Sequence, residues 1–207
     1  MRVVIDARWI GPAPSGVGVY TAELLRRLPP LAPGWQWHLL FADEERRRRV
    51  LGEQAPEWSV NVTSEVLSCG IFAPESQWRL PRRLRALRAG LYHSTNYLLP
   101  YLAFAPGGAG GRGCGRAAVT IHDVIPLLIA DHAPRARKSR LRPLFRACLR
   151  QSVRRAAAVL TVSNTARSDI IRALRLEEAE AARIHVVYNG VSEIFRPRPA
   201  DAGRGGV

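Results

Sequence analysis

The sequence Ala117-Ala118-Val119-Thr120-Ile121-His122-Asp123, followed by Val124-Ile125-Pro126, is the stretch that most strongly indicates the fold. Its apolar start predicts a buried strand, and the proline blocks further regular structure after the pair His122-Asp123. In an open α/β sheet, ligands bind outside the carboxyl ends of the strands. A histidine at such a strand end can exchange a proton near neutral pH. The same pattern also fits a core histidine that a backbone carbonyl satisfies, and these residues alone leave both interpretations open.

Strands and helices are predicted to alternate along the chain on both sides of this run. Apolar or alternating segments predict strands at 2–5, 35–42, 58–63, 91–93, 159–162 and 184–188. Helical spacing or a charged pattern predicts helices at 17–28, 43–51, 74–89, 141–154 and 177–182, and one more after the N-cap residue Ser163. We expect Pro29-Pro30 to end the first helix. The alternation favours an α/β fold, with a mainly parallel sheet covered by helices on both faces.

Length and composition predict one domain with a sizeable core. The chain has 207 residues, of which 47% are hydrophobic. We place the domain at residues 1–196. The glycine-rich stretch 106–115 predicts a flexible loop, and the Pro/Gly/Arg-rich tail at 197–207 predicts disorder.

Cysteine usage and hydropathy favour a cytoplasmic location. The three cysteines form no Cys-x-x-Cys pair, which disfavours a zinc site or a disulfide framework. No stretch reaches the roughly 18 apolar residues that a membrane span needs. Asp6 and Arg8 interrupt the first apolar run, so the N-terminus is unlike a signal peptide.

The net charge is +14 and is carried almost entirely by arginine, because Lys138 is the only lysine. Such a surface attracts phosphate groups, anionic lipid or nucleic acid. Arginines recur at 142, 146, 150 and 154, and a second group lies within 82–88. Neither group alternates with aromatic residues that could stack on bases, so nucleic acid is the less favoured partner. For any single arginine, a solvated helix face remains the alternative.

Four predicted strand ends carry polar or glycine residues that could form one polar rim along an edge of the sheet. They are Ser15-Gly16-Val17-Gly18, Ser94-Thr95-Asn96, His122-Asp123 and Ser163-Asn164. Glycines at a helix start let a ligand approach the backbone, where unpaired N–H groups attract an anion. The dinucleotide-binding pattern fails because Thr21 occupies the third glycine position. Each site also has a structural alternative, namely a tight turn, a loop contact or a helix cap.

Several other kinds of site are not indicated. The sequence has no Asp-x-Asp and no His/Asp/Glu cluster at metal-ligand spacing, so we expect no bound metal and no cofactor. It also lacks Gly-x-Ser-x-Gly, which leaves a hydrolase nucleophile unsupported.

Taken in order, the motifs resemble those of glycosyltransferase family 4, a large group of retaining enzymes with the GT-B fold. The matching segments are Ile5-Asp6-Ala7-Arg8, Ser15-Gly16-Val17-Gly18-Val19-Tyr20, the run from Tyr92 to Pro100, Thr120-Ile121-His122-Asp123, Thr161-Val162-Ser163-Asn164 with Asp169-Ile170, and Val186-Val187-Tyr188-Asn189-Gly190-Val191. They span nearly the whole chain, and the loop at 106–115 departs from the pattern as an insertion would. The resemblance implies the Rossmann-like N-terminal half of a GT-B architecture.

The resemblance also implies roles for particular residues. His122 and Asp123 would be catalytic, with His122 orienting a hydroxyl or taking its proton. The N–H groups of 16–18 (Gly16, Val17 and Gly18) would stabilise the donor diphosphate. The remaining assignments are Tyr20, Asn96, Ser163 and Asn164 on the acceptor side, and Asn189 with Gly190 as the hinge.

The implied substrates are a nucleotide-sugar, which is a co-substrate, and a glycan or lipid-linked acceptor. The donor-binding C-terminal domain of such enzymes is expected to be absent from this chain, and a separately encoded partner could supply it. One wall of a two-walled site would bind the donor weakly, so we expect the chain alone to be inactive or nearly so. The arginine groups would suit peripheral contact with anionic lipid at the inner face of the cell membrane. The alternative is a non-catalytic binding module, or remnant, that docks a glycan, anionic lipid or protein partner.

Overall fold

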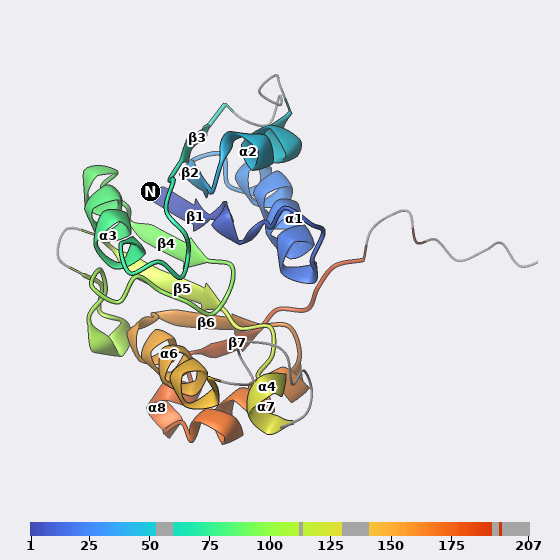
Figure 1. Ribbon diagram of the computed structural model, residues 1–207, viewed down its shortest axis with the longest axis vertical. Helices are drawn as coiled ribbons and strands as arrows, with labels where there is room; N and C mark the ends of the chain where they lie inside the picture. The colour runs from blue at the N-terminus through green and yellow to red at the C-terminus, as the bar shows by residue number, and fades with distance from the viewer. Residues whose placement is uncertain (53–59, 112–113, 130–140, 192–194, 196–207) are drawn as a thin grey trace, which may run out of the picture.

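The computed structural model describes residues 1–52, 60–111, 114–129, 141–191 and 195. Seven strands form one parallel sheet in the order β3-β2-β1-β4-β5-β6-β7 (Figure 1). The strands are β1 (Arg2–Asp6), β2 (Gln36–Phe41), β3 (Val62–Val66), β4 (Leu91–Ser94), β5 (Arg116–Thr120), β6 (Ala158–Thr161) and β7 (Ile184–Val186). The helices are α1 (Gly16–Leu31), α2 (Glu44–Leu51), α3 (Ser76–Ala86), α4 (Ile125–Leu128), α6 (Arg142–Arg155), α7 (Asn164–Leu174) and α8 (Glu178–Ala181), with short 3-10 turns η1 (Ala7–Trp9) and η3 (Pro106–Gly108). The predicted parallel α/β fold is confirmed.

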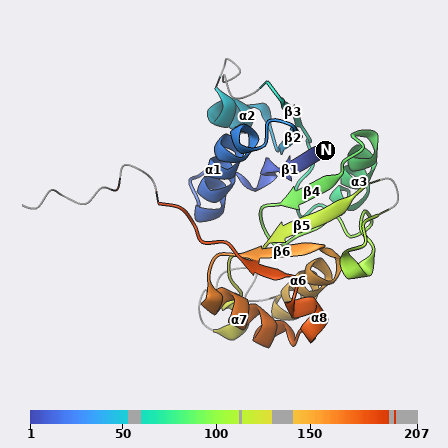
Figure 2. The same ribbon diagram turned by 180° about the vertical axis from the view of Figure 1, so that it is seen from behind.

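The two faces of the sheet carry separate apolar cores, because successive strand residues point to opposite faces. On β1, Val3 and Ile5 pack with α1 and α2, through residues such as Leu25. Val4 packs on the other face, in the core that includes Leu84 of α3 and residues of α6 and α7. Figure 2 shows the same layers from behind. Alternate residues of a strand therefore pack against different sets of helices.

The order of the strands creates a switch point between β1 and β4. The chain runs outward through β1, β2 and β3, and then returns through α3 so that β4 pairs with β1. In this topology, the crevice outside the carboxyl ends of the two central strands is where ligands bind. The segments that leave β1, β4 and β5 carry the Gly16–Gly18, Asn96 and His122 motifs to this edge.

Two predicted element boundaries are wrong. The prolines Pro29 and Pro30 lie inside α1, which ends at Leu31. They occupy its last turn, where the proline φ suits a helix and where only the final backbone hydrogen bonds are lost. The third strand begins at Val62, whereas the apolar run predicted 58–63, and residues 58 and 59 lie outside the described residues. As the edge strand, β3 is only partly buried, so polar residues compose much of it and an apolar run does not mark it.

In the sequence, helical spacing predicts an apolar stripe on the basic helix, and only part of this stripe is buried in the structure; its residues are Leu141, Leu144, Phe145, Cys148, Leu149 and Val153. Phe145, Leu149 and Val153 are buried where α6 packs against the sheet, and this part of the prediction is confirmed. Leu141 and Leu144 are instead exposed, at 50% and 57%. Leu141 is the N-cap residue of α6, and Leu144 lies in its first turn.

Glycines in the 106–115 stretch are required by packing. Gly107, Gly108 and Gly110 have positive φ, a conformation that other residues rarely adopt. A Cβ added to Gly115 would overlap the carbonyl oxygen of Gly90, and one added to Gly111 would overlap that of Ala103. Positive φ or close backbone approach therefore explains the glycines at 107, 108, 110, 111 and 115, and the flexibility of the loop stays a prediction.

Replacing Gly115 with alanine is expected to destabilise the domain, because its Cβ would be forced into the β4 backbone. The expected loss is about 1–3 kcal/mol in the free energy of unfolding, as for other overpacked sites. Gly34→Ala is the matched control, since a Cβ there meets nothing within 4 Å. Urea denaturation of both variants measures the difference, and equal midpoints would show that this contact does not constrain the fold.

Candidate functional site

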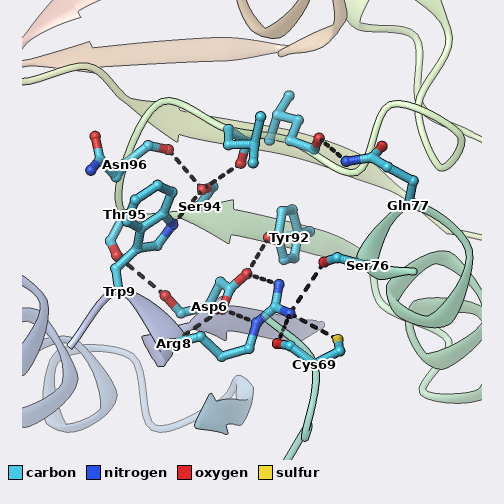
Figure 3. A network of polar contacts seen from close by, with 12 residues as sticks. Asp6, Arg8, Trp9, Cys69, Ser76, Gln77, Tyr92, Ser94, Thr95 and Asn96 are labelled. Carbon is cyan, nitrogen blue, oxygen red and sulfur yellow. Dashed lines mark hydrogen bonds and ion pairs between the residues drawn. The ribbon is translucent and has the colours of Figure 1, made fainter. Parts of the chain in front are cut away.

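A buried ion pair lies at the carboxyl end of β1 (Figure 3). The Arg8 guanidinium donates two hydrogen bonds to the Asp6 carboxylate, with its Nε at 2.8 Å and a terminal nitrogen at 2.7 Å. Both side chains are only 2% exposed. The other terminal nitrogen of Arg8 donates to the carbonyl of Cys69 and to the hydroxyl of Ser76, each at 3.2 Å. The Tyr92 hydroxyl donates to Asp6 at 2.7 Å, so the pair joins four segments of the chain.

The electrostatics of this network keep the Arg8 guanidinium charged. Burial alone lowers the pKa of Arg8, but the Asp6 carboxylate more than offsets that effect, and the net pKa lies above its ordinary value. Burial and the same carboxylate raise the pKa of Tyr92 well above its ordinary value. Tyr92 therefore remains a neutral donor. Asp6, Arg8 and Tyr92 all lie in segments that carry the family resemblance. In the structure they bond to one another and so hold the segments around the crevice together.

His122 follows β5 and lies at the same edge of the sheet, half-buried. Its Nε2 is 3.1 Å from the carbonyl oxygen of Thr95, the residue after β4. Its ring meets the Tyr20 ring of α1 edge to face, with 4.7 Å between the centroids and 90° between the planes. Two predicted site residues, one from α1 and one after β5, are thus brought into contact. The contact with the Thr95 carbonyl also fits the other interpretation of the sequence, in which a backbone carbonyl satisfies a core histidine.

A chain of polar groups continues from Tyr20 into the domain. The Tyr20 hydroxyl lies 3.2 Å from the Thr120 hydroxyl, which lies 2.9 Å from Nε2 of His93. Burial, together with the smaller effect of the His122 charge, lowers the pKa of His93 to about 4. Sequence reasoning assigned no role to Thr120 or His93. His93 and Thr120 lie on the same face of the sheet, the one that α1 covers. The sequence could have indicated their contact only if the register between β4 and β5 had been known.

The N-terminus of α1 is capped by a side chain. Ser15 has extended backbone, and its hydroxyl accepts a hydrogen bond from the Gly18 N–H at 3.1 Å. This is a normal helix cap, and it uses one of the three N–H groups that were expected to meet a diphosphate. Gly16 is exposed, and a Cβ there would meet nothing within 4 Å, so the backbone at Gly16 is open to approach.

The remaining predicted residues have local structural contacts. Asp123 is exposed, and its carboxylate accepts the Ile125 N–H. Asn96 accepts the N–H of Tyr97, its neighbour in the chain.

A second polar group lies after β6. Ser163 caps α7 by accepting the Ala166 N–H at 3.0 Å. Asn164 is exposed and donates to the Tyr188 hydroxyl at 2.9 Å. That contact brings the start of α7 next to the predicted hinge, Asn189 and Gly190, both of which are exposed. The acceptor and hinge assignments stay predictions.

The described part of the chain contains no group of three His, Cys, Asp or Glu side chains placed to hold a metal ion. Among the same residues, no helix has the length and apolar character needed to cross a membrane.

A family model for Glycosyltransferase Family 4 matches residues 14–193. The chain belongs to glycosyltransferase family 4. The parallel sheet and this match fit the N-terminal, Rossmann-like domain of a GT-B glycosyltransferase. A comparison with curated proteins finds no match. In this glycosyltransferase domain, the contact between Tyr20 and His122 lies where an open α/β sheet binds ligands.

The Asp6–Arg8 pair is expected to dominate the stability of the glycosyltransferase crevice. Asp6→Asn leaves a buried arginine without its counter-charge and should lower the free energy of unfolding by about 3–5 kcal/mol. Arg27→Met, which breaks an exposed pair with Glu23, should cost about 1 kcal/mol or less. In denaturant titrations, the double variant Asp6→Asn/Arg8→Met should lose less stability than the two single variants added together. Strict additivity would mean that the two charges are not coupled.

The low pKa of His93 predicts that acid destabilises the domain. Between about pH 6.5 and pH 4, the unfolded chain binds a proton at this histidine and the folded chain does not, so stability falls as the pH falls. Going from pH 7 to pH 5 should cost about 2 kcal/mol through His93. His93→Gln should reduce this loss, whereas His185→Gln, at an exposed position, should leave it unchanged. Unfolding curves at the two pH values measure both, and an unaltered loss in His93→Gln would contradict the assignment.

Proposed function

We propose that this domain supplies the acceptor-side wall of a retaining GT-B glycosyltransferase, which transfers a sugar from a nucleotide-sugar to a glycan or lipid-linked acceptor. Membership of glycosyltransferase family 4 supports sugar transfer. The observation that carries the finer proposal is the contact between His122 and Tyr20 at the switch-point edge of the sheet. The proposal further holds that a donor-binding domain must form the opposite wall, because one wall alone does not preorganise the reacting atoms.

In the proposed site, His122 orients the acceptor hydroxyl or takes its proton. A carbonyl oxygen only accepts hydrogen bonds, so the contact with Thr95 requires that Nε2 of His122 carries the hydrogen. A neutral His122 then has its accepting lone pair on Nδ1. Asp123 would act from the next position in the chain.

The donor diphosphate is proposed to lie against the N-terminus of α1. Backbone N–H groups and the helix dipole at such an end favour phosphate. Ser15 already occupies the Gly18 N–H, so the proposal assigns the diphosphate chiefly to the N–H groups of Gly16 and Val17. No metal or cofactor is part of this proposal, and the described residues offer no three-ligand cluster to hold one.

Contact with anionic lipid at the cytoplasmic face of the membrane is proposed only for part of the basic surface. Arg142 and Arg150 of α6 donate to the backbone carbonyls of Leu127 and Leu174. Arg146 and Arg154 are exposed on the same helix. In the other group, Arg83 pairs with Glu65, while Arg82 is exposed.

The diphosphate proposal is tested by removing one N–H group without disturbing the helix. Gly16 is the first residue of α1, a position where proline is common. A proline requires extended backbone at the preceding residue, and Ser15 already has it (φ −147°, ψ 154°). Gly16→Pro should therefore fold normally but bind UDP and GDP about 10- to 150-fold more weakly, which corresponds to the roughly 1.5–3 kcal/mol of one charge-assisted hydrogen bond. Gly16→Ala keeps the N–H group and should retain binding.

The measurement is a titration of each nucleoside diphosphate into the 15N-labelled chain, followed through the amide resonances. Shifts should concentrate at residues 16–18, and the Gly34 amide is the internal reference for non-specific effects. Equal affinities for Gly16→Pro and Gly16→Ala, or shifts confined to other elements, would refute the assignment.

A further inference from the structure

We propose that His93 is a positioning residue of this site: through the Thr120 hydroxyl, it sets the hydrogen-bonding polarity of the Tyr20 hydroxyl beside His122. The inference rests on the proposed function only in naming the acceptor hydroxyl as the group that Tyr20 and His122 meet. The chain of contacts itself is a property of the folded domain. It runs from β4 through β5 to α1, three elements that are far apart in the sequence.

The burial of His93 favours keeping its hydrogen bond to the Thr120 hydroxyl. It is 6% exposed and stands on the α1 face of β4, next to Ile5 of β1 in the strand register. Its Nε2 lies 2.9 Å from the Thr120 hydroxyl, and Thr120 is fully buried. Leaving a buried polar group without a partner is costly, so this hydrogen bond is maintained in the folded state.

Counting hydrogens shows how His93 controls Tyr20. If Nε2 carries the ring hydrogen, it donates a hydrogen bond to the Thr120 hydroxyl, and that hydroxyl can in turn donate a hydrogen bond to the Tyr20 oxygen. Tyr20 then has its hydrogen available for donation. If Nε2 is the unprotonated nitrogen, Thr120 must donate to His93 and Tyr20 must donate to Thr120. Tyr20 then offers only an oxygen lone pair, so the tautomer of His93 decides whether Tyr20 can donate a hydrogen bond to another group.

The neighbouring charges are compatible with a neutral His93. Asp6 stands on the opposite face of the sheet and is paired with Arg8. On α1, Glu23 is partly exposed and paired with Arg26 and Arg27. His122 is the titratable group whose charge acts on His93, and it opposes a second positive charge there. The histidine pair can therefore change charge at His122 while His93 keeps its hydrogen-bonding role.

NMR of the ligand-free 207-residue chain tests the relay. Imidazole 15N spectra should show His93 neutral and in one tautomer from pH 7 down to pH 5. Thr120→Val and His93→Leu should each shift the Tyr20 Cζ resonance, assigned with Tyr20→Phe, and the His122 ring resonances. His93→Gln places an amide near the position of Nε2 and should restore both towards wild type. His185→Gln is the matched control and should change neither.

Two results would overturn the proposal. One is a His93 that becomes protonated between pH 7 and pH 5. The other is folded Thr120→Val chain with unchanged Tyr20 and His122 resonances. If His93→Leu does not fold, Thr120→Val and the wild-type tautomer still decide the outcome. Because no ligand is present, failure of nucleotide or acceptor binding would refute the proposed function and leave the relay standing.

Discussion

The buried pair of Asp6 and Arg8 is the constraint on which the crevice depends. Two opposite charges cannot remain inside a domain unless their hydrogen-bonding groups are satisfied, and here the partners come from the segment after β3, from α3 and from β4. The strand order brings β4 beside β1, and the pair fixes how the surrounding segments meet there. Thr95 extends the same arrangement by donating to the Asp6 carbonyl, and its own carbonyl faces His122. The charged network and the candidate site therefore share one backbone framework.

Sequence reasoning found the elements that show a periodic pattern and missed features that depend on their pairing. Apolar runs followed by polar residues predicted the parallel sheet and placed strand ends near Asp6, Ser94 and Thr120. The edge strand β3 did not, because a partly buried strand needs few apolar residues. The relay through His93 and Thr120 also escaped, because it requires the β4–β5 register and the position of α1 on one face.

The candidate site shows a related limit. Ser and Asp residues that could serve catalysis are also the residues that cap helices and close turns. Ser15, Ser163 and Asp123 all make such local contacts in the structure. For these side chains, residue type and spacing cannot separate the two roles. For His122 the contact with Tyr20 across 102 residues of sequence adds information that a local pattern does not contain.

The two outer strands of the sheet also bear on how the domain behaves in a crowded solution. An outer strand exposes backbone N–H and C=O groups that can pair with another chain, and long apolar edges promote aggregation. Here β7 has only three residues, and β3 carries Glu65 paired with Arg83. Short length and charge are both features that discourage strand addition. The same polar edge that obscured β3 in the sequence therefore protects the sheet against edge-to-edge association.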